Sequence, residues 1–181
     1  YMEFRYKAML AMRDAHDRFL RVEKEFKQVF GREYGGLLDT YRCDDAEVVL
    51  VAAGSVAATA KDVVDALREK GQAVGLARLR SFRPFPHEEV RALASKVAGM
   101  GVLDRSYTFG AAGAFFTEIK GSVYSCQKRP VMKNYIAGLG GRDITPKILE
   151  KIFEDIQLTT KRGGGDEVEW VDVAGLPRRW R

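Results

Sequence analysis

Residues 44–55 read Asp44-Asp45-Ala46-Glu47-Val48-Val49-Leu50-Val51-Ala52-Ala53-Gly54-Ser55, an unbroken apolar run between a pair of acids and a tight turn. An apolar run without alternation is typical of a strand that is buried on both faces of a parallel sheet. A predicted helix from about Ala58 to Lys70 follows the turn. The stretch therefore predicts the first strand–helix unit of an α/β domain.

Three further strand–helix units follow along the chain. The predicted pairs are Ala73–Leu79 with His87–Val97, Gly101–Leu103 with a helix from Gly113 through Ile119, and Val131–Ile136 with a helix from Thr145-Pro146 to about Ile156. A short edge strand, Leu37–Tyr41, precedes all of them. Repeated strand–helix order favours right-handed crossovers with helices on both faces of the sheet. The predicted fold is a three-layer α/β/α domain with a mostly parallel sheet of about five strands.

The segments on either side of this domain differ from it in pattern. Before it, apolar residues recur every three or four positions and form one helical stripe, which ends at Gly31: Ala8, Met12, Ala15, Phe19, Val22, Phe26 and Val29. We expect this stripe to pack on the chain's own sheet. After the domain, residues 161–166 read as a flexible linker, and Val168 to Val173 as a terminal strand or docking arm. The predicted division is 1–36, 37–160 and 161–181.

Length and composition fit a globular domain with its own core. The chain has 181 residues, of which 46% are hydrophobic and 30% charged. Its longest apolar stretches, such as Val48 to Ala53, are far shorter than the roughly 20 residues of a membrane-spanning helix. Two cysteines form neither a disulfide framework nor the four-thiolate set of an iron–sulfur cluster, which favours the cytoplasm. Because the chain begins at Tyr1 rather than Met, we expect a piece of a longer polypeptide.

The net charge of +5 is concentrated in one region. Between Lys120 and Lys147 six cations stand against Asp143 alone, and elsewhere the two signs nearly cancel. A surface for single-stranded nucleic acid needs aromatic residues interleaved with basic ones, and this region lacks that pattern. The sequence therefore argues against a nucleic-acid partner.

Arginines follow several of the predicted strands at their carboxyl ends, where open parallel sheets bind ligands. The candidate residues at this edge are Arg80, Arg83, Arg105, Arg142 and Asp143. Arginine and glycine turns suit a phosphate or a carboxylate. The alternative, which we favour, is that the arginines pair with Asp104 and Asp143 and that the edge docks against another domain.

The sequence offers no self-sufficient catalytic, cofactor-binding or metal-binding set. The turn Gly54-Ser55 lacks the spacing of a dinucleotide site or a P-loop. The two histidines, His16 and His87, are predicted on the polar side of the first helix and at a helix start, and neither completes a triad. Cys43 and Cys126 read as small apolar residues, and Asp44-Asp45 as a loop pair that bonds its own backbone.

Several segments nevertheless occur in the order of a known family across nearly the whole chain. They are Phe30-Gly31-Arg32-Glu33-Tyr34-Gly35, Asp44-Asp45-Ala46-Glu47, Gly54-Ser55, Arg80-Ser81-Phe82-Arg83-Pro84-Phe85-Pro86, Leu103-Asp104-Arg105 and Gly138-Leu139-Gly140-Gly141-Arg142-Asp143-Ile144-Thr145. Each is weak alone, but together they resemble the alpha subunit of pyruvate:ferredoxin oxidoreductase (pyruvate synthase) and related 2-oxoacid enzymes. The matching part is the family's second domain, which is similar to the carboxyl-terminal domain of transketolase. That resemblance implies one antiparallel edge strand, to which Leu37–Tyr41 would correspond.

The resemblance implies an enzyme that decarboxylates a 2-oxoacid oxidatively with coenzyme A. Thiamine diphosphate, Mg²⁺ and 4Fe–4S clusters would belong to other domains of the complex, so no catalytic, cofactor or metal residue is carried onto this chain. The implied partners are the thiamine-binding and iron–sulfur subunits, with ferredoxin reached indirectly, in an oligomer. Residues 1–36 would connect from a preceding thiamine-binding domain, and Arg142 with Asp143 would lie at an interdomain or intersubunit contact.

Three alternatives stay open. The domain could come from a branched-chain 2-oxoacid or oxalate oxidoreductase, although pyruvate is the first choice. It could be a non-catalytic regulatory module that binds an anion, such as a phosphate of coenzyme A, along Arg80, Arg83, Arg105 and Arg142. A separate small enzyme is the least supported, because no nucleophile–base pair can be assembled.

Overall fold

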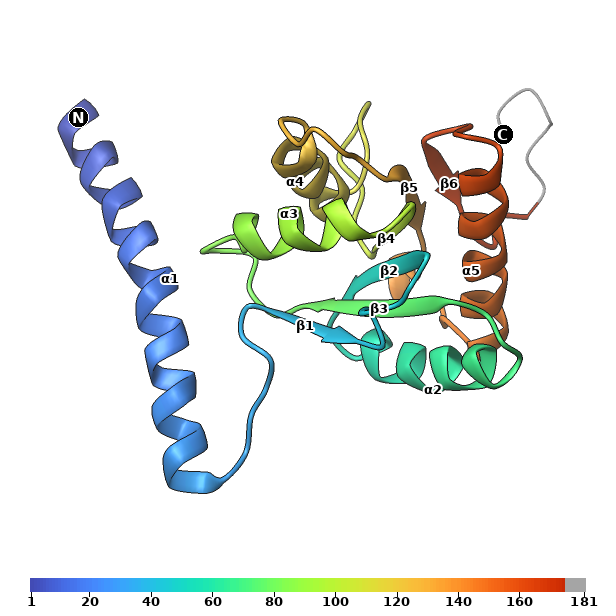
Figure 1. The fold of residues 1–181 in the computed structure, drawn as a ribbon. Helices are drawn as coiled ribbons and strands as arrows, with labels where there is room; N and C mark the ends of the chain where they lie inside the picture. The colour runs from blue at the N-terminus through green and yellow to red at the C-terminus, as the bar shows by residue number, and fades with distance from the viewer. Residues whose placement is uncertain (175–181) are drawn as a thin grey trace.

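A six-stranded sheet forms the centre of the protein in the computed structural model, which describes residues 1–174 (Figure 1). The strands lie in the order β1-β3-β2-β4-β5-β6. Their bounds are β1 Leu38–Tyr41, β2 Val48–Ala53, β3 Val74–Leu79, β4 Gly99–Asp104, β5 Val131–Ile136 and β6 Val168–Trp170. All neighbours run parallel except β1, which pairs antiparallel with β3. The prediction of a mostly parallel sheet with an antiparallel edge strand is confirmed.

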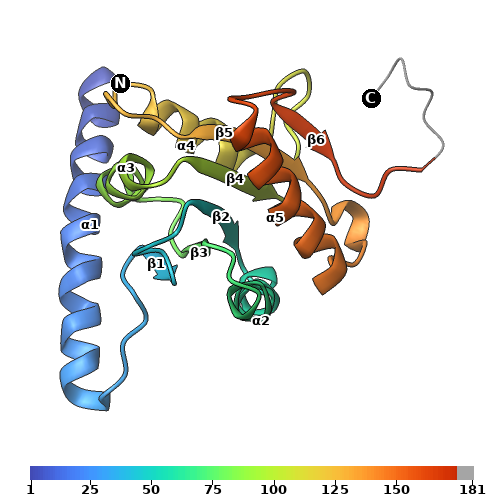
Figure 2. The same ribbon diagram turned by 45° about the vertical axis from the view of Figure 1, so that its right-hand side comes forward.

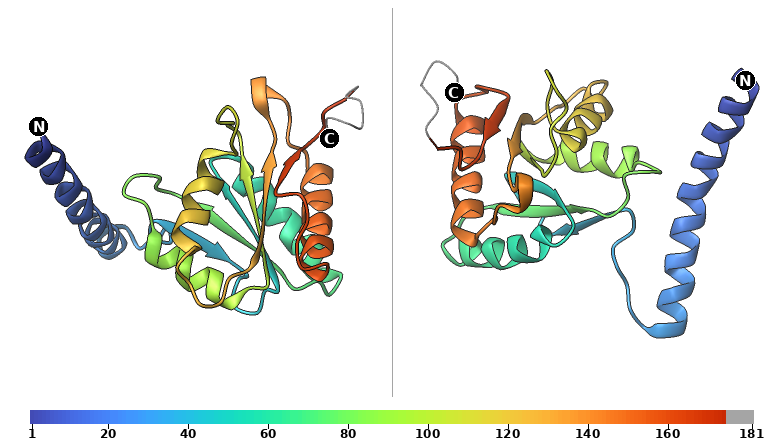
Figure 3. Two further views of the ribbon diagram at one scale, coloured as in Figure 1. Left: turned by 90° about the horizontal axis from the view of Figure 1, so that it is seen from above. Right: turned by 180° about the vertical axis from the view of Figure 1, so that it is seen from behind.

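Two pairs of helices cover the two faces of the sheet (Figure 3). The helices are α1 Met2–Phe30, α2 Val56–Glu69, α3 His87–Lys96, α4 Ala114–Val123 and α5 Pro146–Lys161, with a short 3-10 turn, η1, at Leu139–Gly141. The pair α3 and α4 covers one face, and the pair α2 and α5 covers the other. At the start of α5, Thr145 Oγ1 accepts a bond from the Ile148 amide and Pro146 occupies the first helical position. Among residues 1–174 no helix is long and apolar enough to cross a membrane.

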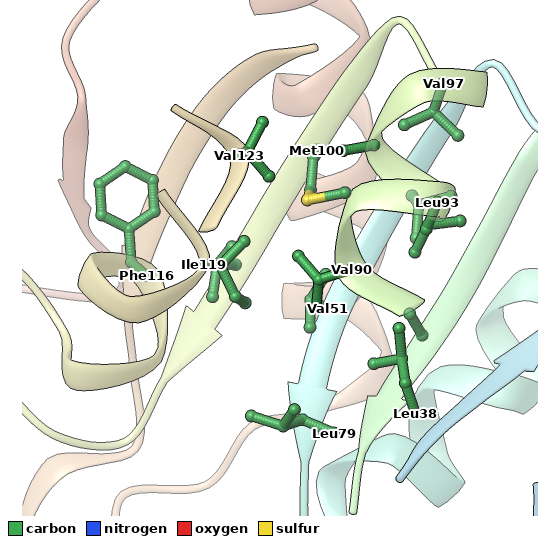
Figure 4. Close-up of a cluster of buried hydrophobic side chains, with 14 of the residues drawn as sticks. Leu38, Val51, Leu79, Val90, Leu93, Val97, Met100, Phe116, Ile119 and Val123 are labelled. Atoms are coloured by element: carbon green, nitrogen blue, oxygen red, sulfur yellow. The ribbon is translucent and has the colours of Figure 1, made fainter. Parts of the chain in front are cut away.

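The hydrophobic core is divided by the sheet into two clusters. Figure 4 shows the first, in which Leu93 of α3 and Ile119 of α4 pack over Val51 and Met100 of the central strands. In the second, Phe153 and Ile156 of α5 and residues of α2 pack against Leu50 and Leu76. Neighbouring residues of β2 thus enter opposite clusters, as its unbroken apolar run predicts. Val49 and Leu50 are both wholly inaccessible to solvent.

The strand β6 extends the sheet beyond the five strands expected from the sequence. It pairs with β5 through Asn134–Val168, Tyr135–Glu169 and Ile136–Trp170. Lys133 of β5 supports this edge, because its ammonium lies 2.7 Å from Asp155 of α5 and 3.7 Å from Glu169 of β6. Of the two alternatives for this segment, the terminal strand is therefore the one observed.

Helix α1 does not pack on the sheet, which overturns the expectation for its apolar stripe. None of its residues is buried, and Figures 1 and 2 show it standing as a separate rod beside the body, joined through residues 31–37. The helical period and the end at Gly31 are as predicted, and Gly31 adopts the left-handed conformation. The cause of the error is that both faces of the sheet are already covered by α2 to α5, so no face remains for a fifth helix.

Replacing Phe153 by Ala tests the packing of α5 on the sheet. Phe153 is wholly buried, so the variant leaves a cavity, and we expect the free energy of unfolding to fall by about 3–5 kcal/mol. Leu158→Ala on the same helix is the control, because half of that side chain is exposed, and we expect a loss of about 0.5 kcal/mol or less. Urea denaturation at 25 °C gives both values. Equal losses in the two variants would contradict the assignment of this core.

Candidate functional site

The carboxyl ends of β2, β3, β4 and β5 carry the loops that the sequence marks as the candidate site. Parallel strands present these ends at one edge of the sheet. Gly54 follows β2, Arg80 follows β3, Arg105 follows β4, and Ala137-Gly138 follow β5. Whether these loops form a binding site depends on which partners their side chains contact.

A buried pair of polar side chains fixes the loop after β4. The Asp104 carboxylate is inaccessible to solvent and accepts bonds from the amides of Phe115 (2.9 Å) and Phe116 (3.1 Å) in the first turn of α4. It also accepts from Asn134 Nδ2 at 2.9 Å. The other atom of that side chain, Asn134 Oδ1, accepts from the Gly113 amide at 2.8 Å. The last residue of β4 therefore satisfies two of the free amides at the start of α4.

The bonds of Asp104 to α4 explain why residue 113 is a glycine and why the pKa of Asp104 is shifted. A Cβ on Gly113 would lie 2.1 Å from Cγ of Asp104, so only glycine allows the carboxylate this close to the start of α4. Burial raises the pKa of Asp104 above its ordinary value, and the bonds from Phe115, Phe116 and Asn134 oppose that rise. The expected pairing of an arginine with Asp104 does not occur, since Asp104 is bound by amides instead.

Arg80 turns away from the sheet edge toward α1. Its guanidinium donates to Glu23 of α1 at 2.7 Å and to the Gly36 carbonyl at 2.6 Å. It also lies 5.6 Å from the Phe19 ring centroid and 5.5 Å from that of Tyr34. Together with the contact between His16 Nε2 and Glu89 (3.1 Å), this ion pair helps to hold α1 against the body.

Arg83 is engaged with α4. It donates to Glu118 at 2.8 Å, and its guanidinium stacks on the Phe82 ring at 4.2 Å. Arg80 and Arg83 therefore have separate carboxylate partners on separate helices. The four predicted arginines are not brought together into one anion site.

Arg105 and Arg142 do lie near one turn. Arg105 Nη2 is 3.5 Å from the Gly138 carbonyl, and Arg142 donates to the Asp172 carbonyl, with the Asp172 carboxylate 3.6 Å away. Asp143 is exposed beside them. A hollow of about 300 Å³ opens here, lined by Gly138, Leu139, Arg142, Trp170 and Val171 among others. Of the five predicted site residues, Arg142 thus lines this hollow, and Arg105 lies at the Gly138 turn beside it.

The two histidines and Cys43 form contacts between elements of the fold. His87 Nδ1 lies 2.7 Å from Ser122 Oγ, which links α3 to α4. Burial raises the pKa of Cys43 to about 11, and its thiol donates to the Leu76 carbonyl at 3.2 Å. Asp45 bonds its own backbone, as predicted for this loop, and it also pairs with Arg68 at 2.7 Å. Within residues 1–174 no three His, Cys, Asp or Glu side chains are grouped to hold a metal ion.

The residue that sequence reasoning missed is Asn134. It lies in the middle of β5, is wholly buried, and bonds to Asp104, Gly113 and the Val102 carbonyl. The signal available was an amide side chain inside a strand that is otherwise read as buried, because such a group needs partners. The sequence does not reveal which partners those are.

Comparison with known proteins gives concordant matches. A protein-family model described as pyruvate:ferredoxin oxidoreductase core domain II matches residues 46–149. The ketoisovalerate oxidoreductase subunit VorA of Pyrococcus horikoshii is 45% identical over 174 residues, which cover 96% of this chain and 44% of the relative. The pyruvate synthase subunit PorA of Methanothermobacter thermautotrophicus is 47% identical over 152 residues, which cover 84% of this chain and 38% of the relative.

A solved structure supports the fold. A split-gene transketolase, an inactive β4 tetramer, superposes with a TM-score of 0.51 at 15% identity, covering 64% of this chain and 39% of that chain. At this identity the likeness concerns the fold alone, and it agrees with the predicted likeness to transketolase. The chain spans less than half the length of the two curated relatives.

Asp104→Ala tests the polar pair at the start of α4. The variant leaves the backbone amides of Phe115 and Phe116 without an acceptor and removes one of the two bonds that Asn134 Nδ2 donates, so we expect the free energy of unfolding to fall by about 2–4 kcal/mol. Asp143→Ala is the matched control, because that carboxylate is exposed, and it should change stability by about 0.5 kcal/mol or less. Both are measured by urea denaturation. A loss in Asp104→Ala no larger than in the control would refute the role given to Asp104.

Proposed function

The chain belongs to the pyruvate:ferredoxin oxidoreductase core domain II family, and on that premise we propose that it is an assembly domain of the alpha subunit of a 2-oxoacid:ferredoxin oxidoreductase. The complex would oxidise a 2-oxoacid with coenzyme A and pass the electrons to ferredoxin. With pyruvate the products are acetyl-CoA, CO₂ and reduced ferredoxin. The catalytic residues would lie in other domains of that complex.

The cofactors of this reaction would also lie outside the chain. A 4Fe–4S cluster normally takes four thiolates, and the chain has two cysteines, of which Cys43 is buried and protonated. The cluster therefore does not fit here. We place thiamine diphosphate, Mg²⁺ and the clusters in the other subunits or domains, with this chain in the cytoplasm as part of an oligomer.

The observation that carries the assembly role is the uncovered apolar stripe of α1. Phe26, Phe19 and Ala15 are half-buried and line one hollow with Arg80, whereas Met12, Val22 and Val29 are 41%, 61% and 73% exposed. Exposed apolar patches of this kind mark interaction surfaces. Since the relatives are more than twice as long as the matched region, we propose that the thiamine-binding part of the enzyme covers this stripe.

Pyruvate is the first substrate we propose, and a branched-chain 2-oxoacid is the second candidate. The second is favoured by one observation: VorA subunits from three Pyrococcus species match 96% of the chain at 45–46% identity. Pyruvate synthase subunits that match the same share are 37–40% identical. The 47% identity to one PorA subunit covers 84% of the chain and supports pyruvate.

Val22→Asp tests the docking of α1. A carboxylate on the stripe would be buried without a partner at the contact, so we expect the yield of co-purified partner subunits to fall roughly tenfold or more. Circular dichroism of the variant chain should stay unchanged, because Val22 is exposed. Gln28→Asp is the control, since it adds the same charge on the charged side of α1. Equal recovery of partners with both variants would reject the docking role.

The substrate is tested on the complex that contains the chain. We expect coenzyme A-dependent reduction of ferredoxin to be fastest with pyruvate and slower with 2-oxoisovalerate at equal concentration. The reduction is followed by the loss of ferredoxin's visible absorbance. A reversed preference selects the second candidate, and no reduction with either acid contradicts the proposed enzyme class.

A further inference from the structure

The turn after β5 presents main-chain amides to one side. Gly138 (φ 71°, ψ 17°) and Gly140 (φ 65°, ψ 20°) are left-handed, while Leu139 between them lies in the right-handed 3-10 turn. Alternating left- and right-handed residues turn successive N–H groups into one concavity, which is a common backbone site for anions. Only glycine adopts this conformation easily at both left-handed positions.

Those amides and an arginine beside them are free to bind. In residues 1–174 the N–H groups of Leu139 and Gly140 have no hydrogen-bond acceptor, and both residues lie in an exposed turn. No carboxylate of those residues forms an ion pair with Arg105, whose Nε lies 3.0 Å from the Cβ position of Gly138. An exposed guanidinium and several amides at one place are the donor set of a phosphate site.

The hollow next to the turn offers an apolar aromatic wall. Trp170 lines it together with Leu139 and Val171, and the indole is 42% exposed. Tyr107 packs against Trp170 with ring centroids 4.7 Å apart, which fixes the orientation of the indole. At about 300 Å³ the hollow is at the lower end of the range for small-molecule sites.

The charges around the hollow do not by themselves create a preference for an anion. Arg142 lines the hollow and shares its charge with Asp172, while Asp143 is exposed beside the turn. The four charges Arg105, Arg142, Asp143 and Asp172 sum to zero, so net charge alone does not attract a ligand. Binding would depend on the directed donors of Arg105 and of the turn, which suits a compact phosphate better than a diffuse polyanion.

We propose that this surface binds a nucleotide, with a phosphate on the Leu139 and Gly140 amides and Arg105 and the base on Trp170. Nucleotide binding goes beyond the proposed assembly role and does not depend on that role, because α1 and the hollow lie at opposite edges of the sheet. The Arg80 and Arg83 positions of the predicted anion edge take no part, since Glu23 and Glu118 hold them.

Calorimetric titration of the full chain with ADP, inorganic phosphate and adenosine tests this site. We expect ADP to bind more tightly than phosphate, and adenosine most weakly. Arg105→Ala should weaken ADP and phosphate roughly tenfold or more, because a bond to a charged group is lost. Trp170→Ala should weaken ADP and leave phosphate unchanged. Circular dichroism checks that each variant is folded.

Arg83→Ala is the matched control, because it removes another exposed arginine, whose partner is Glu118. It should bind ADP like the unaltered chain. Equal ADP affinity of Arg105→Ala and Arg83→Ala would overturn the phosphate site. Phosphate that binds as tightly as ADP would overturn the part of the proposal that concerns the base. A chain that fails to bind ADP and still assembles with its partners would reject this site and leave the proposed function intact.

Discussion

Burial of β2 on both faces is the constraint on which the architecture depends. Its side chains alternate between two clusters, and full burial of each Val or Leu is worth about 1.5–3 kcal/mol. Both faces must therefore be covered, and helical crossovers between parallel strands supply that cover. The helices α2 and α5 on one face and α3 and α4 on the other follow from this requirement. Helix α1 is then left without a face of the sheet to cover.

The elements inside the domain could be predicted because their signals are local. The strands β2 and β5 match the predicted bounds residue for residue, and Thr145 with Pro146 correctly marks the start of α5. The place of α1 could not be predicted, since periodicity defines an apolar face but does not identify what covers it. The sequence left residues 168–173 as either a terminal strand or a docking arm for a related reason. The three residues of β6 form a strand only because they pair with β5, which is remote in sequence.

In the candidate site too, the positions of the arginines could be predicted from the sequence, but their partners, which are remote in sequence, could not. The rule that ligands bind at the carboxyl ends of parallel strands singled out Arg105 and Arg142, and both lie beside the turn after β5. It failed to separate them from Arg80 and Arg83, because the partners Glu23 and Glu118 lie 57 and 35 residues away. A long arginine side chain can reach several neighbours, so only the fold decides which one it meets. The Asp104–Asn134 contact was hidden for the same reason.

The order of the strands separates the two surfaces of this domain. Arg80 ties α1 to the edge formed by β1 and β3, whereas the hollow opens beside β5 and β6 at the other end of the sheet. Between them, Asp104 and Asn134 fix the loop after β4 and set the position of Arg105. A partner that covers α1 at the first edge would leave the Trp170 side accessible. One small domain can therefore be held in an assembly through one edge while the opposite edge stays open to a ligand.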